Sequence, residues 1–396
     1  MLSLDKVFNA QTVLKNIVRE TKLVRAYGIA PDCELYLKPE NLQITGSFKV
    51  RGSAYKIAML TDEEKRRGVI ACSAGNHAQG VALAATKNGI KSLICLPDSA
   101  PISKVEATKG YGAEVCLVEG CYDDAYAKAL ELRDSEGYTF VHPFDDENVI
   151  AGQGTIALEI LNDLDNIDAI VVPIGGGGLI SGIAYTAKQI RPSIKIYGVQ
   201  AAGAPSMYNS VKDGEIERLS SVSTIADGIA VKQPGENTYA LVKEYVDEIA
   251  LVTDDEVSSA ILALIEKQKM IAEGAGAVAV AAVMFGKFNF KNKRVVAVVS
   301  GGNIDVTSLS RVIDRGLLKS GRSSSLLIEL IDKPGQLKEI SRIIADCGGN
   351  VTGVHYEKGD TESVNGCFLR IEMETRDFEH VNLITKTLRD EGFKLV

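Results

Sequence analysis

The chain has 396 residues, a length that predicts two or three compact domains rather than one. Of these residues 45% are hydrophobic and 24% are charged, which is typical of a globular protein with a sizeable core. The formal net charge of −8 disfavours nucleic acid or an anionic membrane as the main partner, because both reward basic surfaces. No apolar run reaches the roughly 18 residues of a membrane-spanning helix, and the first residues lack the basic-then-apolar order of a signal peptide.

The seven cysteines include no C-x-x-C pair, and the four histidines show no spacing typical of metal ligands. Such scattered cysteines suit a reducing compartment better than a disulfide or zinc framework. We therefore expect a cytoplasmic protein without a metal site.

Short β-branched runs alternate with amphipathic stretches through the first three quarters of the chain. The runs that predict strands are 34–38, 69–73, 92–96, 114–118, 169–174, 195–199 and 295–300. Helix-like stretches lie between them, for example 122–136 and 257–270. This order predicts an α/β fold with a buried parallel sheet.

Three glycine-rich segments, 73–77, 175–179 and 300–303, each follow a predicted strand. Parallel sheets bind ligands at the carboxyl ends of their strands, so the three segments are expected to form one site. Lys49 lies in the mostly uncharged run 45–52. A lysine together with several backbone-donor loops suits a ligand that carries both a reactive carbonyl and a phosphate, and pyridoxal 5'-phosphate has both groups.

Five ordered motifs make the chain resemble the threonine dehydratases (threonine ammonia-lyases), which are fold type II pyridoxal-phosphate enzymes. The motifs are Pro39-Glu40-Asn41 with Ser47-Phe48-Lys49, residues 73–80, the tetraglycine run, residues 273–277 and residues 300–303. The resemblance implies a two-lobed, tryptophan synthase β-like catalytic domain over 1–320, with a smaller lobe at about 50–150. It also implies dehydration and deamination of L-threonine to 2-oxobutanoate and ammonia, with weaker activity on L-serine.

In the resemblance, Lys49 binds the cofactor covalently and then removes the Cα proton of the substrate, with Phe48 beside it. Imine formation needs a neutral amine, so the site must lower the pKa of this lysine. The cofactor phosphate would lie on a glycine turn at a helix N-terminus, where free N–H groups and the helix dipole favour an anion. The residues of this turn are Gly175, Gly176, Gly177, Gly178 and Leu179.

The remaining site residues come from the same resemblance. The substrate carboxylate would be bound by the loop Ser73, Ala74, Gly75, Asn76 and His77. Asn76 would also bind the 3'-oxygen of the cofactor, Glu273 would lie beside the ring, and Ser300 would face the pyridine nitrogen. A hydroxyl at that nitrogen does not protonate the ring, which disfavours transamination and is sufficient for β-elimination.

Two departures from related serine racemases narrow the prediction. Ala74 stands where those enzymes carry a serine that acts as the second acid–base group, so racemisation should be poor. The stretch 200–206 contains no Asp or Glu, where those enzymes bind a divalent metal through two carboxylates, so no metal is expected there.

After a small polar linker at 319–325 the periodicity changes. Strand-like runs at 326–331, 351–357, 367–373 and 393–396 alternate with two amphipathic helices in the order βαββαβ of a ferredoxin-like fold. This region, 321–396, resembles an ACT regulatory domain, which implies an amino-acid effector at turns that carry Asp332, Gly335 and Asn350. Its small core makes pairing with another copy plausible, as a homodimer or homotetramer.

Several alternatives stay open at this point. The effector could be isoleucine, valine or AMP, and the pathway role could be isoleucine biosynthesis or threonine catabolism. A serine dehydratase or racemase and a β-replacement enzyme share the same fold. A non-catalytic amino-acid sensor comes from a different class, although the intact Lys49, Asn76, Ser300 and glycine turn disfavour it.

Overall fold

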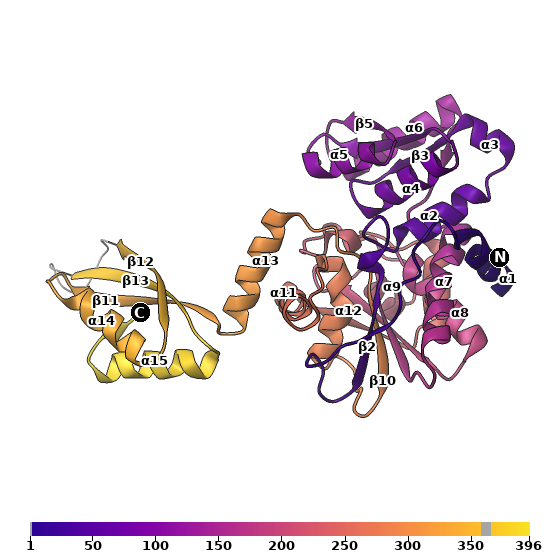
Figure 1. Cartoon of the computed structure of the whole chain (residues 1–396). Coiled ribbons are helices and arrows are strands. Elements are labelled where there is room, and N and C mark those ends of the chain that lie inside the picture. The colour runs from indigo at the N-terminus through magenta and orange to yellow at the C-terminus, as the bar shows by residue number, and fades with distance from the viewer. Residues whose placement is uncertain (1, 358–365) are drawn as a thin grey trace. The chain divides into compact units, whose positions relative to one another are not determined.

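The computed structural model describes residues 2–357 and 366–396. The chain divides into two compact units, Met1–Val306 and Thr307–Val396 (Figure 1). Among the described residues, no helix has both the length and the hydropathy needed to cross a membrane.

The first unit contains two parallel sheets. The larger has the order β1-β2-β10-β7-β8-β9, in which only β1 runs antiparallel to its neighbour. The bounds of its strands are β1 Val24–Arg25, β2 Glu34–Pro39, β7 Ala169–Pro173, β8 Lys195–Ala201, β9 Glu248–Val252 and β10 Arg294–Val299. The smaller sheet, β5-β4-β3-β6, is parallel throughout. The bounds of its strands are β3 Val69–Cys72, β4 Ser92–Pro97, β5 Glu114–Val118 and β6 Thr139–Phe140.

Twelve α-helices of at least six residues surround these sheets in the described part of the first unit. They are α1 Leu4–Leu14, α2 Lys49–Ala58, α3 Asp62–Arg67, α4 Asn76–Lys87, α5 Ile102–Gly110, α6 Tyr122–Glu136, α7 Glu147–Asp163, α8 Gly178–Ile190, α9 Ser206–Asp213, α10 Glu236–Tyr245, α11 Asp254–Ala263 and α12 Gly274–Met284. Shorter turns lie at η1 Glu40–Leu42, η2 Asp227–Ile229 and the π-helical η3 Leu264–Gln268.

The central strands β7 and β10 of the larger sheet are covered on both faces, which explains why they are apolar along almost their whole length. Ile170 and Val172 of β7 belong to one core cluster together with residues of α7 and α8. The helix α12 packs on β10, β7 and β8 and is buried along almost its entire length. A helix enclosed in this way needs no polar face, which accounts for its Ala- and Val-rich sequence.

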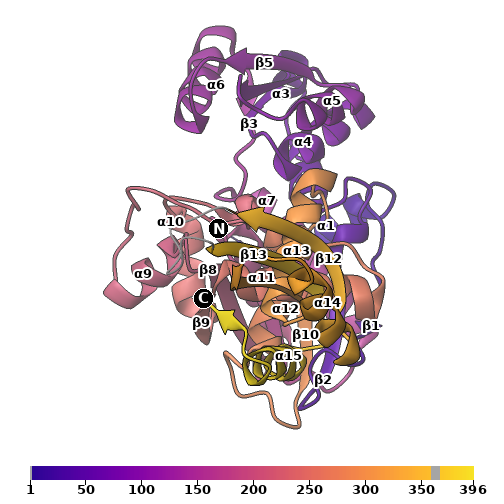
Figure 2. The ribbon, with the colours of Figure 1, turned by 90° about the vertical axis from the view of Figure 1, so that its left-hand side faces the viewer.

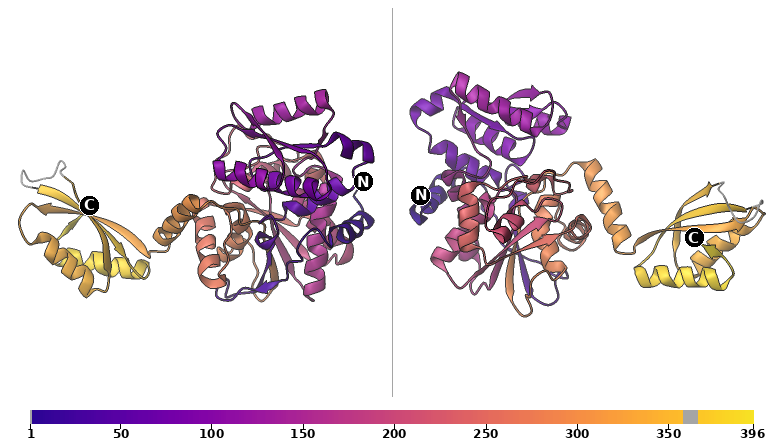
Figure 3. Two further views of the ribbon diagram at one scale, coloured as in Figure 1. Left: turned by 45° about the horizontal axis from the view of Figure 1, so that its top comes forward. Right: turned by 180° about the vertical axis from the view of Figure 1, so that it is seen from behind.

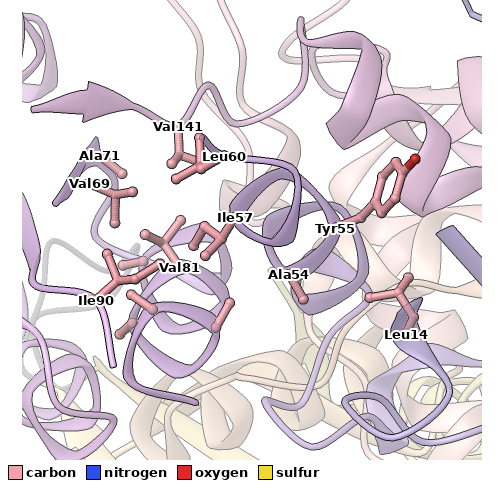
Figure 4. Close-up of a cluster of buried hydrophobic side chains, with 14 of the residues drawn as sticks. Leu14, Ala54, Tyr55, Ile57, Leu60, Val69, Ala71, Val81, Ile90 and Val141 are labelled. Atoms are coloured by element: carbon pink, nitrogen blue, oxygen red, sulfur yellow. The ribbon is translucent and has the colours of Figure 1, made fainter. Parts of the chain in front are cut away.

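The two sheets form the cores of separate lobes, visible in the views from the front and from the side (Figures 1 and 2) and from two further directions (Figure 3). The helix α2 packs against α4 of the smaller lobe and against α7 of the larger. A cluster of buried apolar side chains joins α2, α4 and β3 (Figure 4). It includes Ile57 of α2, Val81 of α4 and Val69 of β3, all fully buried. The helix that begins at Lys49 is therefore anchored at the junction of the lobes.

The second unit has the predicted βαββαβ order. The bounds of these six elements are β11 Ser323–Ile331, α14 Gln336–Asp346, β12 Asn350–Glu357, β13 Gly366–Glu374, α15 Phe378–Asp390 and β14 Lys394–Leu395. The helix α13 Val306–Lys319 precedes them. The antiparallel sheet of this unit has the order β12-β13-β11-β14, and α14 and α15 pack against the same core cluster (Figure 1). The predicted fold class is confirmed: an α/β unit built on two mainly parallel sheets is followed by a small unit with an antiparallel sheet.

Two predicted boundaries are wrong. The predicted linker 319–325 overlaps β11, because Ser323, Ser324 and Ser325 pair in register with β13. The helix predicted at 257–270 is observed as α11, an α-helix that both begins and ends earlier, at Asp254 and Ala263. Thr253 and Glu256 form a capping box that begins α11 at Asp254, and the turn after Ala263 is π-helical.

Candidate active site

Lys49 is the first residue of α2, with Phe48 at the N-cap position. Its Nζ donates a hydrogen bond to the carbonyl oxygen of Pro143 at 2.9 Å and lies 5.3 Å from the centroid of the Phe48 ring. The side chain keeps a partial exposure but is crowded by protein, and this desolvation lowers the pKa of Lys49 to about 8, although the charge of Glu273 acts in the opposite direction. A substantial share of the amine is therefore neutral near physiological pH.

The glycine turn follows β7 and leads into α8. Gly177 has φ +100° at the N-cap position of α8, a conformation that favours glycine. A Cβ added at Gly176 would lie 2.4 Å from ring atoms of Phe144, and one added at Gly178 would lie 2.9 Å from the same residue. The turn is held by Thr238, whose Oγ1 donates to the Gly176 carbonyl oxygen at 2.6 Å. The backbone N–H groups of the first turn of α8 have no partners inside the helix, so this turn can bind an anion.

The residues that follow β6 contact both Lys49 and the glycine turn. Pro143 accepts the hydrogen bond from Lys49, and the next residue, Phe144, packs against Gly176. His142 fixes this segment because its Nδ1 accepts hydrogen bonds from the backbone N–H groups of Phe144 and Asp145, at 3.2 and 2.7 Å. Burial lowers the pKa of His142 to about 4, which keeps its ring neutral and able to accept them.

Asn76, Glu273 and Asn303 form a hydrogen-bonded chain, although they come from three distant parts of the sequence. The amide of Asn76 donates to Glu273 Oε1 at 2.6 Å, and the amide of Asn303 donates to Asn76 Oδ1 at 2.7 Å. Asn303 also donates to the Thr45 carbonyl oxygen at 2.7 Å, which ties the chain to the run before Lys49. Burial, followed by the charge of Asp227, raises the pKa of Glu273 to about 7. This carboxyl group can therefore hold or release a proton near neutral pH.

Ser300 directly follows β10 and is buried. Its carbonyl oxygen accepts from the backbone N–H of Phe48 at 3.1 Å, and Ser47 forms a β-bridge with Gly301, so this strand end lies directly beside the Lys49 run. The Ser300 hydroxyl donates to the Ala275 carbonyl oxygen at 3.2 Å. The structure thus brings Ser300 and Lys49 into one region, as the carboxyl-end rule for parallel sheets predicts.

The loop 73–77 directly follows β3 and includes the first two residues of α4. The Ser73 hydroxyl accepts a hydrogen bond from the Gly75 N–H at 3.1 Å, and the Ser73 N–H donates to the Cys95 carbonyl oxygen at 3.3 Å. A Cβ added at Gly75 would meet no atom within 4 Å, so the loop borders open space at this point.

His77 belongs to the interior of the small lobe. Its Nδ1 lies 3.5 Å from the Ser53 hydroxyl and its Nε2 lies 2.8 Å from the Val141 carbonyl oxygen. Burial and then the charge of Lys49 lower the pKa of His77 to about 3. The ring is neutral at physiological pH and has the contacts of a structural residue.

A buried ion network behind Lys49 was not anticipated from the sequence, although Glu40 lies within a motif that the resemblance used. Arg51, two positions after Lys49, donates to both oxygens of Glu40 at 2.8 Å and to both oxygens of Glu159 at 2.6 and 2.8 Å. Lys38 adds a further ion pair with Glu159 at 2.5 Å. Neither the pairing nor the burial has a short-range signal, because the partners lie on η1, α2, α7 and β2.

The predicted effector residues all lie in the second unit, in the part that the structure describes. Gly335 has φ +98° and is the N-cap of α14. The Asn350 amide donates to Glu374 at 2.8 Å, and Asp332 is the residue directly after β11. Their role in effector binding stays a prediction.

Comparison with known proteins agrees with this geometry. A sequence model of the family described as "Pyridoxal-phosphate dependent enzyme" matches residues 14–301. Over 398 aligned residues the chain is 48% identical to the L-threonine ammonia-lyase of Thermotoga maritima, covering 100% of this chain and 99% of that protein. It is 46% identical over 315 residues to the catabolic L-threonine dehydratase of Escherichia coli, covering 78% of this chain and 96% of that protein.

Solved structures show the same similarity. The processed form of threonine deaminase isoform 2 from Solanum lycopersicum superposes with a TM-score of 0.74 at 39% identity, covering 79% of this chain and 94% of that chain. Serine racemase from Dictyostelium discoideum superposes with a TM-score of 0.72 at 36% identity, covering 77% of this chain and 99% of that chain.

The chain therefore belongs to the pyridoxal-phosphate-dependent enzymes, in their two-lobed fold type II form. Within them, the similarity to threonine ammonia-lyases extends over its full length, so the resemblance expected from the five motifs is confirmed. The predicted cofactor, pyridoxal 5'-phosphate, is that of the family.

The described residues fit this cofactor. Lys49 offers a desolvated amine for its carbonyl group, and the glycine turn at α8 offers a backbone cradle for its phosphate that a side chain at Gly176 would obstruct. Asn76, Glu273 and Ser300 offer polar atoms for the ring. The assignment of these individual contacts is taken up below as a proposal.

Proposed function

We propose that this protein catalyses the dehydration and deamination of L-threonine to 2-oxobutanoate and ammonia, with L-serine as a weaker substrate. The observation that carries the proposal is the Lys49 amine at the start of α2, whose pKa is lowered to about 8. It lies beside Ser300 through the Phe48 N–H, and it is linked through Pro143 and Phe144 to the glycine turn. Full-length identity of 48% to an L-threonine ammonia-lyase supports the choice of substrate.

Lys49 has two roles in this proposal. Its neutral amine attaches the cofactor covalently, and after substrate binding it removes the Cα proton. When bound, pyridoxal phosphate supplies the electron sink that lets the Cα proton and then the β-hydroxyl group leave. The lowered pKa of Lys49 serves both roles, because a base works best when its pKa lies near the working pH.

The glycine turn and the 73–77 loop orient the reacting groups. The N–H groups at the start of α8 would bind the cofactor phosphate, assisted by the helix dipole. The Ser73 hydroxyl and the backbone N–H groups around Gly75 would bind the substrate carboxylate, next to the open space at Gly75. Asn76 would bind the 3'-oxygen of the cofactor.

Glu273 and Ser300 would set the charge state around the ring. Ser300 would offer a hydroxyl to the pyridine nitrogen, which accepts a hydrogen bond without becoming protonated. Glu273, which accepts a hydrogen bond from the Asn76 amide and has a pKa raised to about 7, would lie beside the ring and hold or release a proton on its own carboxyl group near neutral pH. Such a site favours elimination over transamination.

Serine racemisation is the second candidate, favoured by the structural similarity to a serine racemase at 36% identity. Against it, Ala74 carries no hydroxyl with which to protonate the substrate from the opposite face. A β-replacement reaction and a non-catalytic sensor are further alternatives.

One assay separates these candidates. The purified protein is incubated with L-threonine or L-serine, and the 2-oxo acid, D-serine and the product with a thiol acceptor are measured, with Lys49→Ala as the control. We expect 2-oxobutanoate to form fastest and Lys49→Ala to form none. D-Serine or a thioether as the main product would refute the proposal, and no product from any substrate would favour the sensor.

We further propose that the second unit is a regulatory domain of the ACT type that binds an amino acid at Asp332, Gly335 and Asn350. Isoleucine is the simplest effector, since 2-oxobutanoate is the precursor of its synthesis, and valine and AMP are the competing choices. A cytoplasmic location and a homodimer or homotetramer complete the proposal. The same assay with each effector added tests it, and a rate that none of the three changes would contradict it.

A further inference from the structure

Three cysteines form a row across the small sheet. Cys72 of β3 is the register partner of Cys95 of β4, and Cys95 is the register partner of Cys116 of β5. Register partners on parallel strands point to the same face, and neighbouring strands lie about 4.8 Å apart. That spacing is within the range of roughly 4.4–6.8 Å between Cα atoms that a disulfide requires.

The three thiols share one apolar environment on this face. They belong to a core cluster that contains Ala125 and Ala129 of α6. Cys72 and Cys95 are fully buried, whereas Cys116 is half-buried. An oxidant from solvent therefore reaches Cys116 first, and Cys95 is the thiol next to it.

The position of β5 makes the Cys95–Cys116 pair easier to close than the Cys72–Cys95 pair. In the sheet order β5-β4-β3-β6, β5 is the edge strand and pairs only with β4 among the described residues, so it can shift toward its neighbour. Burial, followed by the charge of Cys116, raises the pKa of Cys95 to about 12.

The backbone of Cys95 is in direct contact with the proposed substrate loop. Its carbonyl oxygen accepts the hydrogen bond from the Ser73 N–H at 3.3 Å, and Ser73 directly follows Cys72. A change in the position of β4 is therefore transmitted to Ser73 without an intermediate residue.

We propose that Cys95 and Cys116 are a modification site that forms a reversible disulfide when the protein is exposed to a peroxide. The Cys116 thiolate attacks one oxygen of hydrogen peroxide, which yields a sulfenic acid and hydroxide. The Cys95 sulfur then attacks the Cys116 sulfur, and the sulfenic oxygen leaves as water with the proton of Cys95. Two electrons pass from the thiols to the peroxide. A dithiol reduces the disulfide back to the two thiols by thiol–disulfide exchange and itself becomes a disulfide.

The test uses the full-length holoenzyme treated with hydrogen peroxide, blocked with a thiol alkylating reagent and digested for peptide mass spectrometry. We expect a cross-linked peptide pair that contains Cys95 and Cys116, has lost two hydrogens and disappears after treatment with a dithiol. Cys116→Ser should prevent it, whereas Cys121→Ser, which removes an exposed thiol outside the row, should not. A pair that links other cysteines, or alkylation of both residues after oxidation, would overturn the proposal.

A consequence for catalysis can be measured on the same samples. If the disulfide moves the Cys95 carbonyl away from Ser73, the oxidised enzyme should show a raised KM for threonine that a dithiol restores, and Cys116→Ser should show no such change. An unchanged KM in protein with the disulfide fully formed would refute the transmission to Ser73 while leaving the modification site in place. Both readings are independent of whether threonine or serine is the better substrate.

Discussion

Replacing Arg51 with methionine tests whether the buried ion network holds the helix that carries Lys49. Arg51 is 1% exposed and Glu40 is fully buried, so the Glu40 carboxylate cannot be solvated in place, whereas the Glu159 side chain is 11% exposed. Arg51→Met keeps most of the side-chain volume but removes four hydrogen bonds to Glu40 and Glu159, and a fifth to Thr155.

The expected loss of stability in Arg51→Met is large because the negative charges of Glu40 and Glu159 remain after their main positive partner is removed. Removing one partner of a buried ion pair typically costs about 3–5 kcal/mol, since the partner is left buried and uncompensated. Lys38 still neutralises part of the charge on Glu159, but among the described residues Glu40 keeps only the Thr21 hydroxyl as a direct hydrogen-bond partner. We therefore expect Arg51→Met to lower the free energy of unfolding by about 3–5 kcal/mol.

The loss should depend on pH. Burial opposes the charged form of Glu40, but the charge and hydrogen bonds of Arg51 outweigh it and lower the pKa of Glu40 below its usual range. Stability from this carboxylate is present above its unfolded pKa and is lost as the pH falls through its lower folded pKa. The difference between wild type and Arg51→Met should therefore shrink below about pH 4, near the unfolded pKa of a glutamate.

The assay is urea unfolding of the holoenzyme followed by circular dichroism, together with kcat and KM for threonine. Because Lys49 lies on the same helix, a displacement of about 1 Å can lower kcat roughly 100-fold. Arg51→Lys should recover part of both losses, since it restores the charge without the bidentate geometry. Arg66→Met, at an exposed position on α3, is the matched control, with an expected change within about 0.5 kcal/mol. Equal unfolding midpoints for Arg51→Met and Arg66→Met would refute the reasoning.

Four further predictions concern single positions. In cofactor-free protein, labelling of Lys49 by acetic anhydride should rise through about pH 8; a midpoint near 10.5, the usual value for an exposed lysine, would show that the amine is not desolvated. Gly176→Ala would place a Cβ 2.4 Å from the Phe144 ring and should weaken cofactor binding in a pyridoxal-phosphate titration, whereas Gly110→Ala, which meets no atom within 4 Å, should not. The pKa of Glu273 is raised, so the stability that its protonated form contributes is complete below pH 4.5 and is lost as the pH rises through about 7. Glu273→Gln should therefore stabilise cofactor-free protein against thermal unfolding above pH 7, by up to about 3 kcal/mol. The same variant should leave thermal stability near pH 4 unchanged. Gly335→Val strains a backbone at φ +98° and should weaken binding of the effector in calorimetry while unregulated turnover is kept; unchanged affinity would place the effector elsewhere.

The strands and helices that carry a local pattern of apolar residues could be predicted from the sequence. Apolar β-branched runs predicted β2, β3, β4, β5, β7, β8 and β10 close to their observed bounds. The signal is continuous in β3 and β7 because both of their faces are buried. The helix predicted at 122–136 agrees with the observed bounds of α6, Tyr122–Glu136. The two-residue strands β1 and β6 were missed because they are too short to show a period. The half-exposed β9 was also missed, although its sequence is mostly apolar.

The sequence by itself thus determined the class of fold and the residue types of the site, through strand periodicity, the tetraglycine run and the motif around Lys49. Tertiary structure alone decided the partners. The Asn76–Glu273 hydrogen bond spans 197 positions, and the network of Arg51 with Glu159 spans 108. The shifts in the pKa of Lys49 and Glu273 follow from burial, which depends on every element packed around them. Local sequence encodes the conformation of a segment, whereas desolvation and charge pairing arise only when distant segments meet in the folded chain.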